Sequence, residues 1–234
     1  MKRKSNKFQF VMNGEFLEPV KLAKSFIPQW YKDIKPFGYS KVEFGGPTGN
    51  QLKRNIKNCV PFLDALTAGY MITSMVDLYV ESAPDNTKLI KWTSPLDPVA
   101  DRDIESNVLP LPSEFSANHF VWRNKTVLKT PPGYSSILTH PFNRFDLPFL
   151  TLTGIVDTDS IMHNGNVPFF IKKDFEGLIP AGTPIIQVIP FKRESWTLEE
   201  NKELLEENEK LSWNVTSSFF NYYRNNMWHK KDYQ

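Results

Sequence analysis

The chain has one cysteine, no long hydrophobic run and almost no excess of charge of either sign. A single cysteine, Cys59, excludes an internal disulfide and any zinc site built from several cysteines. No run approaches the roughly 20 apolar residues of a membrane-spanning helix, and no targeting segment is evident. A formal net charge of +2 gives no strong signal for nucleic acid. We therefore expect neither a membrane nor a nucleic acid as a partner.

The composition favours a packed domain made of short elements. Hydrophobic residues make up 40% of the chain and aromatic residues 14%, which is enough for a sizeable core. Eighteen prolines favour loops and short strands over long helices, because proline fixes φ and lacks the N–H group. Cys59 lies in an apolar run, Cys59–Leu63, and is expected to be a buried small hydrophobe rather than a nucleophile.

Residues 129–196 hold the densest alternation of strand and turn signals. Gly133 follows two prolines and marks a turn, and Asn164-Gly165 is a typical hairpin turn. Short β-rich runs recur between such turns. This pattern predicts a mainly β protein of the α+β class, built as an antiparallel barrel or sandwich. The expected strands cover residues 70–80, 89–92, 115–122, 134–139, 149–156, 167–171 and 185–189.

The flanking segments predict two helices, a hairpin and a long loop. Residues 8–17 form a hairpin around Asn13-Gly14, and residues 25–34 form a short amphipathic helix with Pro28 in its first turn. Residues 94–112, rich in proline and acidic side chains, are expected to be a long surface loop. We expect a single β-rich domain over 1–196, with a hairpin and helix layer at 8–58 and a core at 59–196. A C-terminal helix and tail occupy 197–234.

The C-terminal helix is expected to run from Leu198 to Arg224. Thr197 and Glu200 match a capping box, which marks a helix start. Its second half carries more aromatic residues than one buried stripe needs: Trp213, Phe219, Phe220, Tyr222, Tyr223 and Trp228. This face packs either on the chain's own β-domain or on another copy, and we predict a homo-oligomer formed through this helix.

Three segments resemble the β-clip core of dUTPases and dCTP deaminases. They are the Pro-Pro-Gly turn at 131–133, Gly154-Ile155-Val156-Asp157, and the run from Ala181 to Gln187. Ala68-Gly69-Tyr70 also resembles the start of that family's first motif. The resemblance implies that Asp157 is the catalytic, water-activating carboxylate. Met71 stands where the family has a metal-binding carboxylate, and the Arg-Ser-Gly motif and the glycine-rich C-terminal arm are absent.

The chain as a whole also resembles uncharacterised proteins of tailed phages. The shared features are the cysteine–proline segment at 59–63, the Pro-Pro-Gly turn and the Gly-Ile-Val-Asp turn. This resemblance implies a viral origin, with a place of action in the host cytoplasm or in the virion. It implies no known activity.

The central region supplies two groups of candidate site residues. Asp157, Asp159 and His163 share one turn and suit a hard divalent cation, although aspartates also favour turns for their own hydrogen bonding. His140, Arg144 and Asp146 form a second polar cluster, which is either a ligand site for a carboxylate or phosphate or a structural ion pair. We take His140, Arg144, Asp159 and Gln187 as ligand-binding candidates beside the catalytic candidate Asp157, and we expect no dedicated metal site.

A scaffold with incomplete catalytic motifs favours a non-enzymatic protein. The leading hypothesis is a phage-type protein that binds a small molecule or a protein partner. One alternative is a nucleotide-processing enzyme, similar to dUTPases and dCTP deaminases, that uses Asp157 with help from Gln187 and Arg144. Another alternative is a structural component of the virion, with the termini and the 94–112 loop as contacts.

Overall fold

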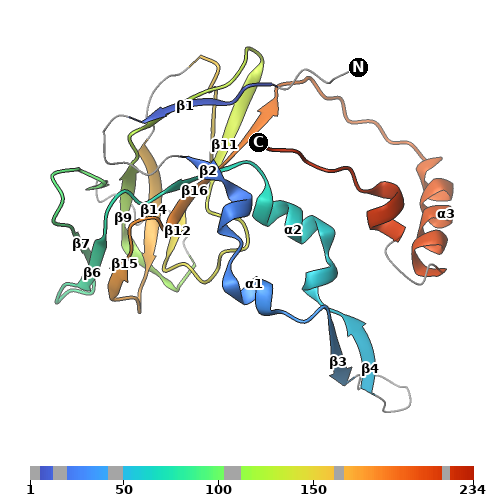
Figure 1. Ribbon diagram of the computed structural model, residues 1–234, viewed down its shortest axis with the longest axis horizontal. Helices are drawn as coiled ribbons and strands as arrows, with labels where there is room; N and C mark the ends of the chain where they lie inside the picture. Colours follow the sequence, from blue (N-terminus) through green and yellow to red (C-terminus); the bar gives the residue numbers. More distant parts are fainter. Residues whose placement is uncertain (1–5, 13–19, 42–49, 103–111, 161–165, 218–221) are drawn as a thin grey trace. The chain divides into compact units, whose positions relative to one another are not determined.

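The computed structural model describes residues 6–12, 20–41, 50–102, 112–160, 166–217 and 222–234 (Figure 1). Contacts divide the chain into two compact units. The first comprises residues 1–32, 65–193 and 233, and the second comprises residues 33–64, 194–232 and 234. The first unit contains the main sheets and all the predicted site residues that the structure describes.

Strands outnumber helices throughout the described residues. The strands are β1 (Gln9–Met12), β2 (Lys21–Leu22), β3 (Phe37–Lys41), β4 (Asn50–Arg54), β5 (Tyr70–Thr73), β6 (Leu78–Ser82), β7 (Lys88–Lys91), β8 (Val99–Asp101), β9 (Phe115–Arg123), β10 (Thr126–Lys129), β11 (Tyr134–Thr139), β12 (Phe149–Thr151), β13 (Gly154–Val156), β14 (Asn166–Lys172), β15 (Gly177–Ile179) and β16 (Pro184–Lys192). The helices are η1 (Ala23–Phe26), α1 (Gln29–Asp33), η2 (Ile56–Asn58), α2 (Val60–Thr67), α3 (Leu204–Ser217) and η4 (Tyr223–Met227).

A five-stranded antiparallel sheet contains Gln187, and His140 and Asp157 directly follow two of its strands. Its strand order is β13-β11-β16-β5-β2, with Ile137 of β11 opposite Ile155 of β13 on one side and Ile189 of β16 on the other. The strand β16 is buried over its first half, from Pro184 to Val188. The sequence of these residues is an almost continuous apolar run, as expected for a strand that is covered on both faces.

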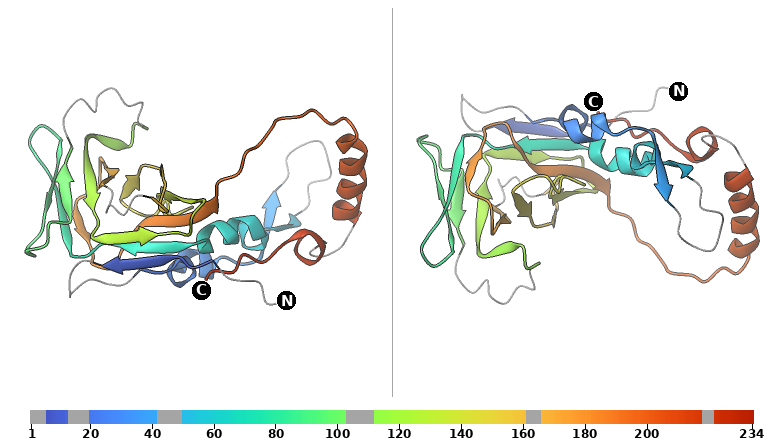
Figure 2. Two further views of the ribbon diagram at one scale, coloured as in Figure 1. Left: turned by 90° about the horizontal axis from the view of Figure 1, so that it is seen from above. Right: turned by 90° about the horizontal axis from the view of Figure 1, so that it is seen from below.

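Besides the two-stranded β1–β10 sheet, two further sheets complete the first unit. One has the order β12-β14-β9-β8 and the other the order β15-β6-β7, with every pairing antiparallel. Both views of Figure 2 place the blue-green β6–β7 hairpin beside the green β9 strand. Asn118 of β9 links the sheets, because its side-chain amide bonds both the N–H and the C=O group of Lys88 in β7.

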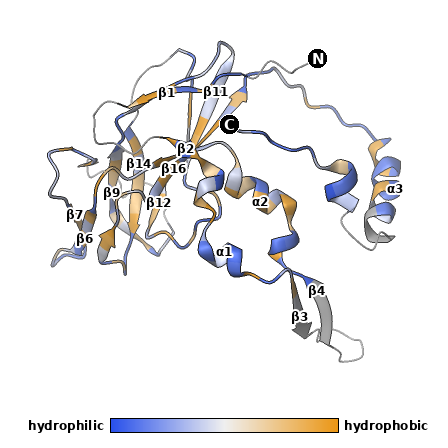
Figure 3. Ribbon diagram, in the orientation of Figure 1, coloured by the Kyte–Doolittle hydropathy of each residue, from blue (hydrophilic) through white to orange (hydrophobic). Residues whose placement is uncertain are grey.

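Aromatic rings form the centre of the core. The Trp122 ring stacks on the Phe169 ring with centroids 3.5 Å apart, and Phe149 meets Trp122 edge-on at 5.2 Å. The Trp122 indole N–H donates to Thr151 Oγ1 over 3.0 Å, so its buried polar atom is satisfied. Figure 3 shows hydrophobic residues, in orange, recurring along β9, β14 and β16. The core is therefore shared by the packed sheets rather than enclosed by one sheet.

The second unit holds the β3–β4 hairpin, most of α2, and α3. Asp64 of α2 accepts hydrogen bonds from the Trp228 indole over 2.8 Å and from Lys231 over 2.7 Å. All side chains of α3 that the structure describes are exposed. No helix in the described part of the chain is long and apolar enough to cross a membrane.

The structure confirms a mainly antiparallel β fold of the α+β class with a short N-terminal and a long C-terminal helix. No described sheet closes on itself, so the sheets are packed and open rather than barrel-forming. The predicted 94–112 loop contains the strand β8, and its remainder from residue 103 to 111 lies outside the described residues. The predicted turns Asn13-Gly14 and Asn164-Gly165 also lie outside them, and β1 pairs with β10.

Both predicted helices have different boundaries in the structure. The segment 25–34 forms η1 and α1, which are separated at Ile27-Pro28, because proline disfavours the helical conformation in the residue before it. The C-terminal helix begins at Leu204 rather than Leu198. Asn201, not Thr197, supplies the side-chain oxygen at its start, accepting from the Glu203 N–H over 3.0 Å.

Candidate functional site

Two turns meet at one end of the five-stranded sheet. Antiparallel pairing sets Ser136 of β11 opposite Val156 of β13, so the Pro-Pro-Gly turn before β11 lies beside the acidic turn after β13. Ser135 Oγ donates to Asp157 Oδ1 over 2.6 Å, and the Gly133 N–H donates to Asp159 Oδ2 over 2.8 Å. The two aspartates thus join the two turns.

Arg193, directly after β16, completes this cluster. Its Nη1 donates to Ser135 Oγ over 2.9 Å and to Asp159 Oδ1 over 3.0 Å, and its Nη2 forms an ion pair with Asp159. Asp157 Oδ1 lies 3.3 Å from the same Nη1. The Asp159 side chain is only 7% exposed, whereas that of Asp157 is 58% exposed. Asp159 therefore ties the turns together, and Asp157 faces solvent.

The charges explain the protonation state of this cluster. Hydrogen bonds from the Arg193 guanidinium and then from the Gly133 N–H hold the pKa of Asp159 well below its usual range. The same pairing with Asp159 raises the pKa of Arg193. Arg193 was not among the residues singled out from the sequence. No local sequence signal identifies it, because its approach to Asp159 depends on the pairing of β16 with β11.

His140 belongs to a second cluster at the opposite end of β11. The Thr151 N–H donates to His140 Nδ1 over 3.3 Å, so this nitrogen carries no proton. The other ring nitrogen, Nε2, carries it and donates to the Arg144 carbonyl over 3.1 Å. Burial lowers the pKa of His140, because the charged ring would lose solvation. His140 is therefore a neutral ring that holds two backbone segments.

Arg144 and Asp146 form an ion pair beside this histidine. Arg144 donates through Nε and Nη2 to the two Asp146 carboxylate oxygens, each over 2.9 Å, and the Trp30 indole N–H donates to Asp146 over 3.2 Å. Burial alone raises the pKa of Asp146, but the hydrogen bonds from Arg144 and Trp30 outweigh it, so the pKa is lowered. The Arg144 side chain is 13% exposed. This pair braces the loop between β11 and β12.

Gln187 is fully buried in β16, opposite Thr139 of β11. Its Oε1 accepts from the Phe142 N–H over 2.8 Å. Its Nε2 donates to the carbonyls of Ala65 over 2.9 Å and Ala68 over 2.7 Å. The amide thus joins the β11–β12 loop to the end of α2.

The five candidate residues consequently form two groups rather than one. Ser135, beside Asp157, and His140 are separated by five residues of extended chain, which corresponds to about 17 Å at roughly 3.3 Å per residue. Asp157 and Asp159 lie at one end of β11, with Arg193. His140 and Arg144 lie at the other end, together with Gln187. The structure does not bring Arg144 or Gln187 to Asp157.

His163, the third predicted member of the acidic turn, lies outside the described residues. Among those described, no group of three or more histidine, cysteine, aspartate or glutamate side chains is placed to hold a metal ion. The Arg193 guanidinium already lies against both aspartates. The carboxylate that remains open to a divalent cation in this cluster is that of Asp157.

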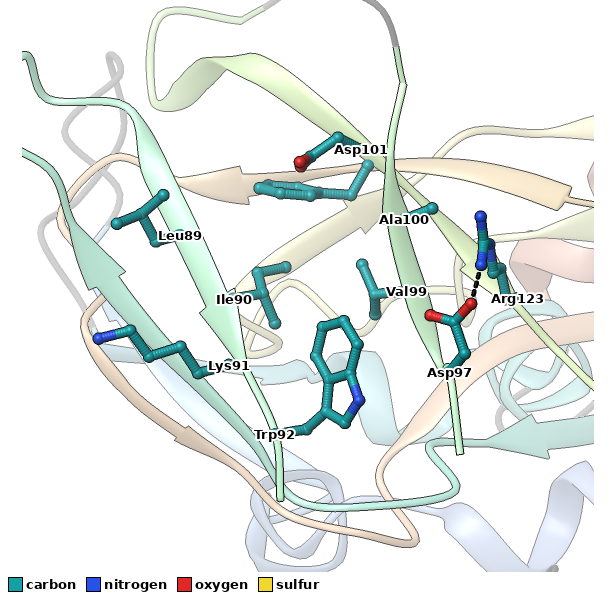
Figure 4. Close-up of a pocket in the computed structure, with 10 residues that line it drawn as sticks. Leu89, Ile90, Lys91, Trp92, Asp97, Val99, Ala100, Asp101 and Arg123 are labelled. Carbon is teal, nitrogen blue, oxygen red and sulfur yellow. Dashed lines mark ion pairs between the residues drawn. The ribbon is translucent and has the colours of Figure 1, made fainter. Parts of the chain in front are cut away.

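A pocket of about 380 Å³ lies elsewhere, between β7 and β8 (Figure 4). Val99 and Phe120, each 2% exposed, form part of its apolar wall, together with Ile90 and Trp92. Charged side chains stand around the opening: Lys91, Asp97, Asp101 and Arg123. This pocket was not predicted. The predicted surface loop at 94–112 includes Asp97, Val99 and Asp101, which line this pocket.

Comparisons with known proteins give a similarity of fold alone. No protein-family model and no curated protein matches the chain. Similar solved structures include a mutant dUTPase from phage phi11 of S. aureus, described with a structural Mg(II) ion, at 16% identity and a TM-score of 0.26. This similarity covers 53% of the present chain and 96% of that one. A mutant dUTPase from Staphylococcus bacteriophage 80alpha, with dUpNHpp, shares 19% identity at a TM-score of 0.25 and covers 53% and 88% of the two chains.

The structure is therefore weakly similar to phage dUTPases over about half of its length, in line with the β-clip resemblance of the sequence.

Proposed function

We propose that this protein is a non-enzymatic binding protein and that the pocket between β7 and β8 is its binding site. The supporting observation is a recess of about 380 Å³ that combines buried apolar walls with a charged opening. Ligand sites in proteins generally have this volume and this mixture of surfaces. In contrast, Asp159, His140, Arg144 and Gln187 use their polar atoms to join segments of the fold.

The pocket chemistry favours an apolar ligand with a polar end. Ile90, Trp92, Val99 and Phe120 offer aliphatic and aromatic contacts, and Asp101 offers a carboxylate at the opening. Asp97 and Arg123 form an ion pair with each other across part of the opening (Figure 4). A ligand therefore finds an apolar surface inside, and the Asp101 carboxylate among charges of both signs at the edge.

Ligand-observed NMR with a panel of small aromatic and aliphatic amines tests this proposal. We expect members of the panel to bind the wild-type protein and to lose binding to Ile90→Arg, because Ile90 is a partly buried residue that lines the pocket. Ile155→Arg is the matched control, because Ile155 is 68% exposed on a different sheet. No binding by any member, or equal binding to both variants, would contradict the proposal.

A second candidate function is nucleotide processing at Asp157. The specific observation is that this carboxylate is 58% exposed and oriented by Ser135 and Arg193. A solvent-facing carboxylate held in this way can activate a water molecule. Asp157 is also the place in this cluster for a divalent cation, which would be needed if phosphate groups are bound there.

Incubation with a panel of deoxynucleotides and Mg²⁺ tests this second function. The expected result is release of pyrophosphate or ammonia, with a loss of about 100-fold or more in Asp157→Asn. Asp174→Asn, at another exposed site, serves as the control. Absence of turnover across the panel removes the enzymatic function and leaves the binding function.

We also propose that the protein assembles as a homo-oligomer through α3 and acts in the host cytoplasm or in the virion. Exposed apolar side chains on α3 support the first part, including Leu205 at 68% and Trp213 at 73%. Co-purification with phage particles distinguishes a virion component from a protein left in the host.

A further inference from the structure

We infer that the pocket between β7 and β8 binds an extended peptide, which adds as a strand to the edges of two sheets. This inference rests on the proposed binding function and names its ligand class. In the described part of the chain, β7 is the last strand of the order β15-β6-β7, and β8 is the last strand of β12-β14-β9-β8. The pocket lies where these two edges face each other (Figure 4).

The hydrogen-bond pattern shows which backbone groups of β8 are open. The Arg123 N–H donates to the Pro98 carbonyl over 2.8 Å, and the Arg102 N–H donates to the His119 carbonyl over 3.3 Å. In an antiparallel ladder, bonded pairs alternate with non-bonded pairs. Val99 and Asp101 are therefore non-bonded positions, and their N–H and C=O groups point away from β9.

The same alternation applies to β7. The Ala83 N–H donates to the Thr87 carbonyl over 2.8 Å, so Lys88 and Ile90 point their backbone groups away from β6. Asn118 occupies these groups at Lys88. At Ile90, which lines the pocket, no corresponding hydrogen bond is present among the described residues. Both edges of the pocket thus offer donors and acceptors to an incoming backbone.

The charged residues at the opening indicate which side chains the bound peptide should carry. Asp97 pairs with Arg123, and Lys91 pairs with Glu81, so these charges are balanced. No hydrogen bond or ion pair reaches the Asp101 carboxylate from any described residue. Arg102 follows Asp101 but belongs to the other face of the strand, where it lies near His119. The complementary ligand is a peptide that alternates apolar side chains, for the pocket wall, with cationic ones.

This geometry favours a peptide over a compact small molecule. Strand addition uses backbone hydrogen bonds for affinity and side-chain pockets for specificity. A strand edge that is open to solvent presents unpaired N–H and C=O groups, which form a template for pairing with another chain. An extended chain satisfies groups on β7 and β8 together and places an apolar side chain against Val99 and Phe120.

A capped peptide of about six residues, with alternating lysine and valine, is the probe, and calorimetry measures its binding. We expect the same peptide with N-methyl groups on alternate amides to bind at least about tenfold more weakly, since it keeps its side chains but cannot pair as a strand. A glutamate–valine peptide should also bind more weakly. The variant Asp101→Lys changes an exposed residue and should instead bind the glutamate–valine peptide about fivefold or more tightly than the lysine–valine peptide.

The outcomes test the proposed ligand class and the proposed binding function separately. Equal binding of the N-methylated peptide, or no change in preference in Asp101→Lys, would overturn strand addition. If the small amines still bind the wild-type protein but not Ile90→Arg, the binding function stands. If peptide binding weakens steadily as the protein concentration rises, a segment of a second copy occupies the pocket, and the free-peptide inference is wrong.

Discussion

Single side chains in this protein act mainly by joining backbone segments that are distant in sequence. His140 links the loop before β12 to Thr151, Asp159 links two turns, and Gln187 links a loop to the end of α2. Each of these side chains is of a type that often takes part in binding or catalysis, but here its polar atoms form hydrogen bonds that hold the fold together. Asp157 differs, because it stays 58% exposed within its cluster.

At the residue scale, His140 makes stability depend on pH. Its pKa is lowered in the folded protein, so the unfolded chain binds the proton more readily. The stabilisation is complete above the unfolded pKa of about 6.5 and decreases as pH falls below that value. Urea unfolding between pH 5 and pH 8 should therefore show a lower free energy of unfolding on the acidic side.

The replacement His140→Asn should reduce this pH dependence. His119, whose pKa is also lowered by burial, contributes in the same pH window, so His119→Asn is the matched comparison. Asp159 acts in a separate window: its lowered pKa gives stability that disappears only as pH falls below about 4. An unchanged pH profile in His140→Asn would contradict the neutral-ring assignment.

At the scale of elements, the connection between α2 and β5 depends on one glycine. Gly69 has a φ of +69°, and its carbonyl accepts from the Ala23 N–H over 3.0 Å. A Cβ atom at this position would lie 2.1 Å from the Val188 carbonyl oxygen in β16. Close packing of the α2–β5 connection against the sheet therefore requires glycine.

The substitution Gly69→Ala should lower the free energy of unfolding by about 3 kcal/mol or more, because it combines a left-handed backbone with a backbone clash. Gly154→Ala is the control, since a Cβ atom there meets nothing within 4 Å. Chemical denaturation of both variants measures the difference. Equal stability of the two would show that β16 can move away from the connection.

Packing between elements also explains why the predicted site separates into two groups. The strand β11 joins the two clusters, with Ser135 near its start and His140 after its end. Because the strand is extended, residues that are close in sequence lie far apart in space. In contrast, Arg193 and Asp159 are distant in sequence and meet because β11 lies between β13 and β16.

At the scale of the whole molecule, the exposed apolar residues of the C-terminal segment predict self-association. Trp213 is 73% exposed and Leu205 is 68% exposed, although both lie on a regular helix. Sedimentation velocity over a range of concentrations should show an oligomer. We expect Trp213→Asp to raise the dissociation constant by about tenfold or more.

Phe145→Asp is the matched control for this experiment, because Phe145 is 79% exposed on a loop outside α3. It should leave the association unchanged. A wild-type protein that stays monomeric at every concentration would contradict the prediction. An equal loss of association in both variants would show that the contact lies outside α3.

The sequence by itself determined the mainly β class, many strand segments and the turns at Gly133 and around Asp157, since alternating apolar residues and turn residues act locally. The expected strands 70–80 and 149–156 are each two strands, which belong to different sheets. Only the tertiary structure decided which strands pair. It thereby brought Arg193 to Asp159, separated Arg144 from Asp157, and opened a pocket between the edges of β7 and β8. The physical reason is that strand pairing joins distant parts of the chain, and the residue pattern of one strand does not specify which strand it pairs with.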